Sequence, residues 1–241
     1  MSVWAVVVAA GGGRRFGAAK QFADLAGRPV VDWSLDVARS VCDGTVLVVP
    51  ADAPGKYAVL DGASAEGGAG AEGVSTAANG GGGRPAYVIV VGGATRSESV
   101  RRGLAAVPQG ADVIVVHDAA RPLAPIGLWR AVVSAVEAGA DGAIPGAPVS
   151  DTVKRIGDGG QLVTLDRSEL VAVQTPQAFV ASVLRQVHAG GDDATDDAAL
   201  VEAAGGRVEL VQTTSENLKI TSPIDLVVAA ALIGAHGAVA R

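Results

Sequence analysis

The chain has 241 residues, a formal net charge of −6 and one cysteine, Cys42. With 19 Lys and Arg against 25 Asp and Glu, it offers no basic field for a nucleic-acid backbone, and a single cysteine excludes an internal disulfide. Its apolar runs are far shorter than the roughly 20 residues of a membrane-spanning helix. We therefore expect neither nucleic acid nor a membrane among its partners.

The first apolar run, residues 3–10 (VWAVVVAA), is β-branched and ends at glycine, which is typical of a strand buried on both faces of a parallel sheet. No basic leader precedes it and no cleavage site follows it, so we expect a cytoplasmic protein. The same pattern then repeats along the chain. It predicts strands at 45–50, 87–93, 112–118 and 142–146, and helices at 30–41, 97–106 and 127–138.

Strands that alternate with helices indicate βαβ units, so we expect an α/β fold with a mostly parallel sheet flanked by helices, in a single domain over residues 1–241. Two segments interrupt this pattern. Residues 61–84 are rich in Gly and Ala and predict a flexible surface insertion. Residues 149–173 hold two alternating runs around a GDGG turn, which predicts a β-hairpin arm that packs on a partner or over a site.

Chemistry-bearing residues appear first in the loop AAGGGRRFGAAKQF, residues 9–22. The loop lacks the third glycine of a dinucleotide-binding fingerprint, and no lysine follows its last glycine as in a P-loop. Glycines beside Arg14, Arg15 and Lys20 could still wrap a polyphosphate with backbone N–H groups and fixed cations. A tight turn with solvated charges is the alternative.

A second group is VHDAARP, residues 116–122. Asp118 ends a predicted strand, where a carboxylate is either a helix cap or a ligand of magnesium, which commonly binds through one or two carboxylates plus substrate phosphates. Arg121 could hold a second phosphate. We expect His117 to be structural, because no other His or Cys is near it in the sequence.

Several motifs follow one another along the chain: AAGxGxR then KQ, GGxxRxxSV, VHDAARP, DTxK, DR, TPQxF, TDDA and NxKIT. In this order they resemble the motifs of the 2-C-methyl-D-erythritol 4-phosphate cytidylyltransferase family, and the resemblance runs from residue 3 to about residue 226. The resemblance implies a Rossmann-like nucleotidyltransferase fold, similar to that of glycosyltransferases of the A type. It also implies a homodimer with interlocking arms, and Mg²⁺ or another divalent cation as cofactor. The implied reaction transfers CMP from CTP to the sugar phosphate and releases pyrophosphate in isoprenoid biosynthesis.

The resemblance also implies a role for particular residues. The catalytic cations would be Arg15, Lys20, Arg167 and Lys219. The nucleotide would be bound by Ala9, Ala10, Gly11, Gly13, Gly93, Arg96, Ser99 and Ala119. The sugar phosphate would be bound by Arg121, Thr152 and Thr175, and the metal by Asp118 and Glu216. Residues of the arm would serve the site of the neighbouring subunit.

Three positions depart from the family pattern: Ala19 replaces a proline before the loop lysine, Ala94 replaces a polar side chain, and Val8 replaces another proline. With Ala94, recognition of the cytosine amino group would depend on backbone carbonyls.

Two alternatives share the fold. One is a cytidylyltransferase acting on ribitol 5-phosphate, and the other is a non-catalytic nucleotide-binding protein, although the cations and Asp118 that such a protein would have lost are present.

Overall fold

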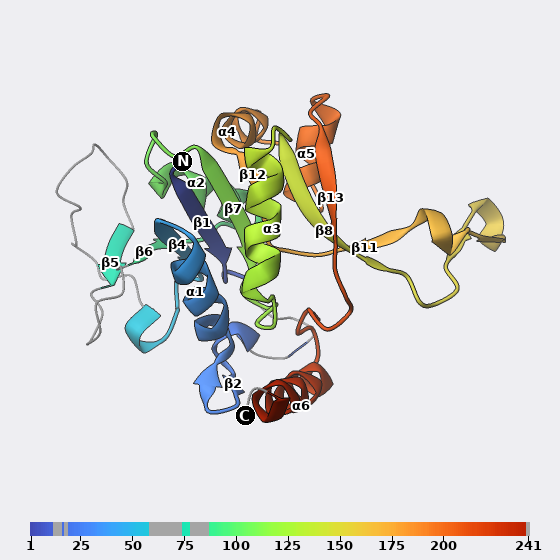
Figure 1. Ribbon diagram of the computed structural model, residues 1–241, viewed down its shortest axis with the longest axis horizontal. Helices are drawn as coiled ribbons and strands as arrows, with labels where there is room; N and C mark the ends of the chain where they lie inside the picture. The colour runs from blue at the N-terminus through green and yellow to red at the C-terminus, as the bar shows by residue number, and fades with distance from the viewer. Residues whose placement is uncertain (12–15, 17–18, 58–73, 78–86, 240–241) are drawn as a thin grey trace.

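The computed structural model describes residues 1–11, 16, 19–57, 74–77 and 87–239, and its centre is a nine-stranded sheet (Figure 1). The strand order is β11-β8-β12-β7-β1-β4-β6-β5, and β13 also pairs with β8. The strands are β1 (Val3–Val8), β4 (Gly44–Val49), β5 (Val74–Ala77), β6 (Tyr87–Val91), β7 (Val113–Asp118), β8 (Gly142–Pro148), β11 (Val171–Val173), β12 (Gln177–Val180) and β13 (Val208–Gln212). Only β5, β11 and β12 run against the common direction, so the sheet is mostly parallel, as the sequence predicts.

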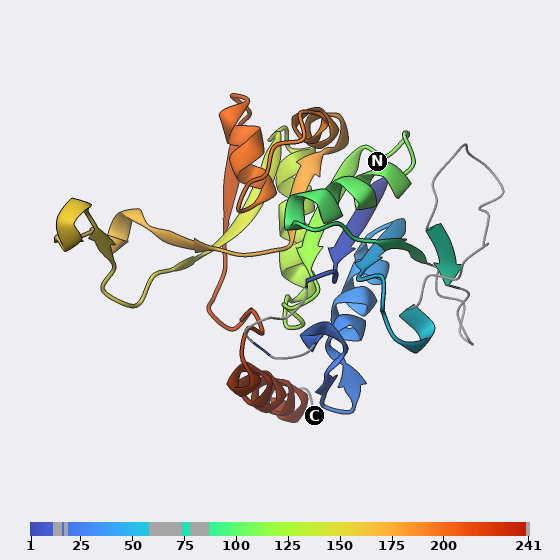
Figure 2. The same ribbon diagram turned by 180° about the vertical axis from the view of Figure 1, so that it is seen from behind.

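Helices cover both faces of the sheet, as Figures 1 and 2 show from opposite sides. They are α1 (Val30–Val41), α2 (Arg96–Ala106), α3 (Ile126–Glu137), α4 (Ala181–Ala189) and α5 (Asp197–Ala203), whereas α6 (Pro223–Val239) lies below the sheet in Figure 1. Successive side chains of β1 point to opposite faces: Ala5 and Val7 join the core under α1 and α3, and Val6 joins the core under α2, α4 and α5. Burial on both faces explains why these strands are continuously apolar.

Helix α2 lies very close to the sheet at Gly103, where a Cβ atom would fall 2.5 Å from Cγ1 of Val6. Only glycine allows this approach without displacing the strand. Because α2 follows β6, its N-terminal end lies beyond the carboxyl ends of the parallel strands. Ligands bind at this edge in open α/β sheets.

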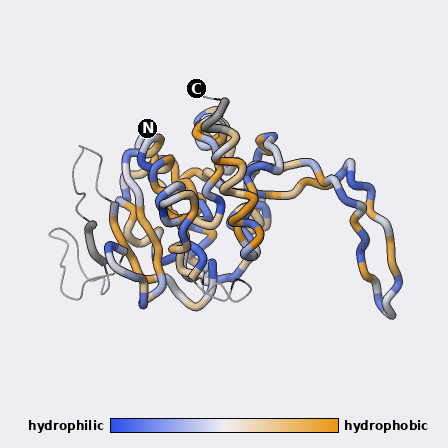
Figure 3. The backbone as a smooth tube through the Cα atoms, turned by 90° about the horizontal axis from the view of Figure 1, so that it is seen from below, coloured by the Kyte–Doolittle hydropathy of each residue, from blue (hydrophilic) through white to orange (hydrophobic). Residues whose placement is uncertain are grey.

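The predicted arm is confirmed as a hairpin that projects from the body of the molecule (Figure 1). Strands β9 (Lys154–Ile156) and β10 (Leu162–Thr164) pair antiparallel, and β11 returns the chain to β8. Figure 3 shows hydrophobic and hydrophilic segments in turn along the arm. The predicted insertion at 61–84 lies outside the described residues except for β5, which forms an edge strand where we expected no regular structure.

The predicted strands and helices are confirmed to within a few residues, but residues 177–212 carried no prediction and hold β12, α4, α5 and β13. The short pair β2 (Asp24–Leu25) and β3 (Arg28–Pro29) packs with α6 in a separate small core. No helix in the described ranges is long and apolar enough to cross a membrane.

Candidate active site

Two cavities of about 250 Å³ each lie next to one another at the carboxyl ends of β1 and β7. The first is lined by Val8, Ala9, Ala10, Gly11, Lys20, Gln21, Gly93, Ala94, Thr95, Arg96, Ser99, Asp118, Ala120 and Lys219. The second is lined by Arg96, Asp118, Arg121, Val173, Gln174, Thr175, Gln177, Thr195, Asp196 and Lys219. Three charged residues, Arg96, Asp118 and Lys219, therefore belong to both cavities and form the wall between them.

Asp118 is the last residue of β7, and both of its carboxylate oxygens bind cations. Oδ1 lies 3.2 Å from Nε of Arg96 and Oδ2 lies 2.5 Å from Nζ of Lys219. Burial raises the pKa of Asp118, but Arg96 and Lys219 outweigh it and hold this pKa far below its usual range. The helix-cap alternative is wrong, because the next helix, α3, begins at Ile126 with Pro125 as its cap.

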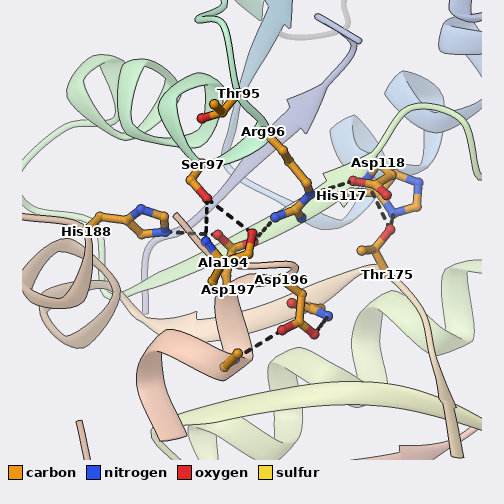
Figure 4. Close-up of polar contacts among 12 residues, drawn as sticks. Thr95, Arg96, Ser97, His117, Asp118, Thr175, His188, Ala194, Asp196 and Asp197 are labelled. Carbon is orange, nitrogen blue, oxygen red and sulfur yellow. Dashed lines mark hydrogen bonds and ion pairs between the residues drawn. The ribbon is translucent and has the colours of Figure 1, made fainter. Parts of the chain in front are cut away.

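Arg96 is the first residue of α2, which begins there because Oγ1 of Thr95 accepts a hydrogen bond from the backbone N–H of Glu98 (3.1 Å). Its guanidinium bridges two carboxylates, through Nε to Asp118 and through Nη1 to Oδ2 of Asp197 at 2.9 Å (Figure 4). Burial lowers the pKa of Arg96, yet Asp197 and Asp118 raise it above its ordinary value. We expected this side chain beside the base and ribose; it lines the first cavity together with Gly93 and Ser99, and it also belongs to the wall that both cavities share.

His117 is fully buried beneath this wall and contacts the ring of Trp129, with ring centroids 4.8 Å apart. Its Nε2 lies 3.1 Å from the carbonyl oxygen of Arg121, which can only accept, so Nε2 carries the proton. Nδ1 therefore accepts from the hydroxyl of Thr175 at 3.1 Å, and the same hydroxyl oxygen accepts from the backbone N–H of Asp118 at 3.0 Å. Burial lowers the pKa of His117 to about 3, so the ring is neutral, and the chain of hydrogen bonds fixes the backbone that carries Asp118 and Arg121.

The second cavity holds a cation that is bound only by neutral groups among its described partners. Nη1 of Arg121 donates to the carbonyl oxygen of Asn217 at 2.7 Å, and Nη2 donates to that of Val173 at 3.5 Å. Asn217 is buried and donates in turn to the carbonyl oxygen of Thr175 (2.9 Å) and to Oε1 of Gln174 (2.8 Å). Carbonyl oxygens orient the guanidinium without neutralising it, so its charge can attract an anion.

The first cavity is bordered by the glycines before α2. The backbone N–H of Gly93 donates to Oγ of Ser99 at 3.1 Å, and that hydroxyl donates to the carbonyl oxygen of Thr95 at 2.9 Å. A Cβ atom on Gly93 would lie 2.2 Å from Cδ of Glu98, whose carboxylate accepts from the N–H of Ala94 at 2.8 Å. The segment is therefore held in one conformation by α2, and Gly93 and Ala94 line the cavity.

Described residues of the opening loop also line the first cavity. Ala9, Ala10 and Gly11 line it, and Lys20 begins a short 3-10 helix (Lys20–Phe22) from which it also lines the cavity. Gly13 and Arg15 lie outside the described residues. Of the nucleotide-binding residues that we expected, Ala119 is fully buried and lines neither cavity, whereas its neighbour Ala120 lines the first.

Three further expected residues, Thr152, Arg167 and Glu216, line neither cavity. Thr152 and Arg167 are exposed on the arm, where Nη1 of Arg167 donates to the carbonyl oxygen of Ser150 at 2.5 Å. Glu216 is exposed and lines neither cavity. Within the described ranges, no three His, Cys, Asp or Glu side chains lie close enough together to hold a metal ion by themselves. Sequence reasoning missed Asp197 and His188, although the TDDA motif contains the former.

Comparison with known proteins decides the family. The family described as 2-C-methyl-D-erythritol 4-phosphate cytidylyltransferase matches residues 3–235. The chain belongs to this family. A relative of that name from Synechococcus sp. (strain CC9902) is 38% identical over 238 residues, which are 96% of this chain and 97% of the relative.

Other relatives define the extent of the match. A bifunctional enzyme IspD/IspF from Clavibacter michiganensis is 42% identical over 225 residues, and the match spans 92% of this chain but only 52% of that protein. Among solved structures, 2-C-methyl-D-erythritol 4-phosphate cytidylyltransferase from Thermus thermophilus superimposes with a TM-score of 0.72 at 32% identity, over 97% of this chain and 98% of that one. The nucleotidyltransferase fold of the family is thereby confirmed. The family's activity is cytidylyl transfer from CTP to methylerythritol phosphate in isoprenoid biosynthesis.

Proposed function

We propose that this chain carries out the activity of its family, transferring CMP from CTP to 2-C-methyl-D-erythritol 4-phosphate with release of pyrophosphate. One observation carries the proposal: two cavities share a wall of Arg96, Asp118 and Lys219, so two phosphorylated ligands can meet at one set of charges. We assign one substrate of the family's reaction to each cavity. We propose the cytoplasm as its compartment, because CTP is available there.

CTP fits the first cavity. The N-terminal end of α2, with the positive end of its helix dipole, borders this cavity, and Lys20 adds a positive charge. We assign the triphosphate to the loop side with Lys20 and Arg15, and the base and ribose to the segment from Gly93 to Ser99. The N–H of Ala94 is already bound by Glu98, and we assign recognition of the cytosine amino group to backbone carbonyl oxygens of this segment.

The sugar phosphate fits the second cavity. Arg121 lines this cavity and not the first, and its charge is held in place by neutral carbonyl oxygens. The buried amides of Gln174 and Asn217 beside it form hydrogen bonds with each other and with backbone carbonyls, which makes the cavity wall rigid. A rigid polar wall is suited to a polyol, because it can form a hydrogen bond with each hydroxyl group of the right substrate. A wrong substrate would leave polar groups unpaired and would therefore bind more weakly.

Asp118 fits a divalent cation that arrives with the nucleotide. A hard cation such as Mg²⁺ prefers carboxylate oxygens and usually binds through one or two of them plus substrate phosphates, so the lack of a three-residue cage among the described side chains does not conflict with it. The low pKa of Asp118 keeps it ionised. When bound, the cation would neutralise charge on the triphosphate; Asp118 would hold it, and Glu216 remains a second predicted ligand.

The reaction then needs positioning and charge more than proton transfer. The phosphate of the sugar is already an anion at neutral pH, so one of its oxygens can attack the α-phosphorus of CTP without a general base. A P–O bond forms there, the bond to the bridging oxygen breaks, and pyrophosphate leaves with the electron pair. Repulsion between the two phosphates opposes the approach, and Lys219, which lies between the cavities, reduces it.

The arm completes the proposal with a second subunit. Ile156 and Leu162 on the arm are 75% and 63% exposed, which is unfavourable for apolar side chains unless another surface covers them. Thr152 and Arg167 lie on the same arm, away from the cavities of their own chain. We propose a homodimer in which each arm supplies these two polar residues to the partner's sugar-phosphate cavity.

Pyrophosphate release tests the proposal directly. We expect release with CTP and methylerythritol phosphate, and little with UTP or ATP. If ribitol 5-phosphate were the better acceptor, the enzyme would be the sister cytidylyltransferase. If no acceptor gave release although CTP bound, the non-catalytic alternative would hold, and activity with UTP alone would overturn the assignment.

A further inference from the structure

Asp197, the first residue of α5, is a buried carboxylate that the reaction described above does not use. It is 1% exposed and lines neither cavity, so it cannot touch either substrate. Its Oδ2 lies 2.9 Å from Nη1 of Arg96, and its Oδ1 lies 2.9 Å from Nε2 of His188 on α4 (Figure 4). Any effect of Asp197 on the reaction must therefore pass through Arg96.

The position of Asp197 is set by contacts between its preceding loop and the start of α2. Oγ1 of Thr95 donates to Asp193 at 2.9 Å, and Oγ of Ser97 accepts from the backbone N–H of Ala194 at 3.2 Å. Asp196 then caps α5 by accepting from the N–H of Ala199 at 3.1 Å. These contacts bring the N-terminus of α5 to the N-terminus of α2, where Asp197 meets the guanidinium.

Two carboxylates compete for one guanidinium at this point. Arg96 uses Nε for Asp118 and Nη1 for Asp197, and because the group is planar, two contacts in different directions fix its rotation. Without Asp197, the group could turn so that Nε and an Nη atom both face Asp118, which is the usual bidentate geometry of an Arg–carboxylate pair. Asp118 would then have fewer lone pairs to offer to the cavity.

We propose that Asp197 is a positioning residue that restrains Arg96 to a single contact with Asp118, and that His188 fixes the orientation of Asp197. This inference rests on the proposed function, in which Asp118 must receive a cation and a nucleotide. A carboxylate oxygen only accepts, so Nε2 of His188 donates to Asp197. Its Nδ1 is buried and has no hydrogen-bond partner in the described structure, so Asp197 is the polar group that retains this ring.

A double-mutant cycle tests the proposal. The isosteric variant Asp197→Asn removes the charge that holds Nη1, and we expect kcat/KM for CTP to fall about 10- to 100-fold, the usual cost of losing the partner that orients a ligand-binding group. In an Arg96→Met background, the same substitution should cause little further loss, because Asp197 has no other route to the site. If the two losses multiply instead, Asp197 acts only through stability and the proposal fails.

Variants of His188 separate orientation from packing. His188→Gln keeps an N–H at a similar reach and should retain most of the activity, whereas His188→Leu fills similar space without a donor and should resemble Asp197→Asn. Arg185 on the same helix is the control, because it donates to the carbonyl oxygens of Leu104 and Val107 (2.9 Å each) and lines neither cavity. Arg185→Met should lower Tm and leave kcat/KM unchanged.

A structural readout separates this inference from the proposed function. In a crystal structure of Asp197→Asn, the guanidinium of Arg96 should have turned toward Asp118. An unmoved guanidinium would overturn the inference even if the enzyme releases pyrophosphate. Absence of pyrophosphate release by the wild-type protein would instead refute the proposed function, while the position of the guanidinium would still decide the role of Asp197.

Discussion

Substitution of Lys219 by Met should separate catalysis from stability most clearly. The ammonium group lies 2.5 Å from Asp118 and lines both cavities, and its side chain is 39% exposed. Methionine keeps the apolar stem and removes only the charge that would offset phosphate repulsion. By comparison with the removal of one preorganised donor from other active sites, kcat should fall about 10²- to 10³-fold.

The cost to folding should be small, because Asp118 keeps its contact with Arg96 and a partly exposed ion pair contributes only ~0.2–1 kcal/mol. For a chain of this size that corresponds to a fall in Tm of at most about 4 °C. Pyrophosphate release under saturating CTP gives kcat, and differential scanning calorimetry gives Tm. A fall in Tm well beyond this range with kcat nearly unchanged would show that Lys219 is structural and not catalytic.

Three further predictions follow from the site. Arg121→Met should raise KM for the sugar phosphate at least tenfold and leave KM for CTP nearly unchanged, because Arg121 lines only the second cavity. Steady-state kinetics with each substrate varied in turn measures both constants, and an equal rise in the two would show that this is wrong. Folding lowers the pKa of His117 from 6.5 to about 3, so the stability that this neutral ring contributes is complete above pH 6.5 and is lost as pH falls toward 3. Urea unfolding between pH 6.5 and 4 should therefore show a smaller loss of unfolding free energy for His117→Gln than for the wild type. Mixing the Arg167→Ala protein with the Lys219→Met protein should restore about a quarter of wild-type activity. After subunit exchange half of the dimers would contain one subunit of each variant, and each such dimer would hold one intact site of two. No recovery would place Arg167 in the site of its own chain.

The sequence predicts the parallel part of the fold well, and the reason is physical. Strands such as β1 and β7 are buried on both faces, so their composition is set by burial and not by their neighbours along the chain. Strand β12 was missed because it is four residues long and antiparallel between β7 and β8, a place that only the folded sheet creates. Strand β5 was missed because its neighbours in sequence are mostly Gly and Ala.

Site residues could be predicted from the sequence where the charge of the side chain itself indicates the function. Asp118, Arg121 and Lys219 are charged residues in distinctive motifs, and the structure brings them to adjoining cavities. His117 was expected to be structural and is, but its partners and the role of Asp197 were not predictable, because the partners are distant in sequence: Thr175 is 58 residues from His117, and Arg96 is 101 residues from Asp197. Such networks depend on how loops meet at the sheet edge.

Transfer of label from CTP tests whether two ligands meet at the shared wall and react at the α-phosphorus. CTP labelled at the α-phosphate, incubated with methylerythritol phosphate and Mg²⁺, should give a labelled diphosphocytidyl sugar and unlabelled pyrophosphate. Label that remains in CMP without the sugar, or that appears in pyrophosphate, would show that the two ligands do not react in this way.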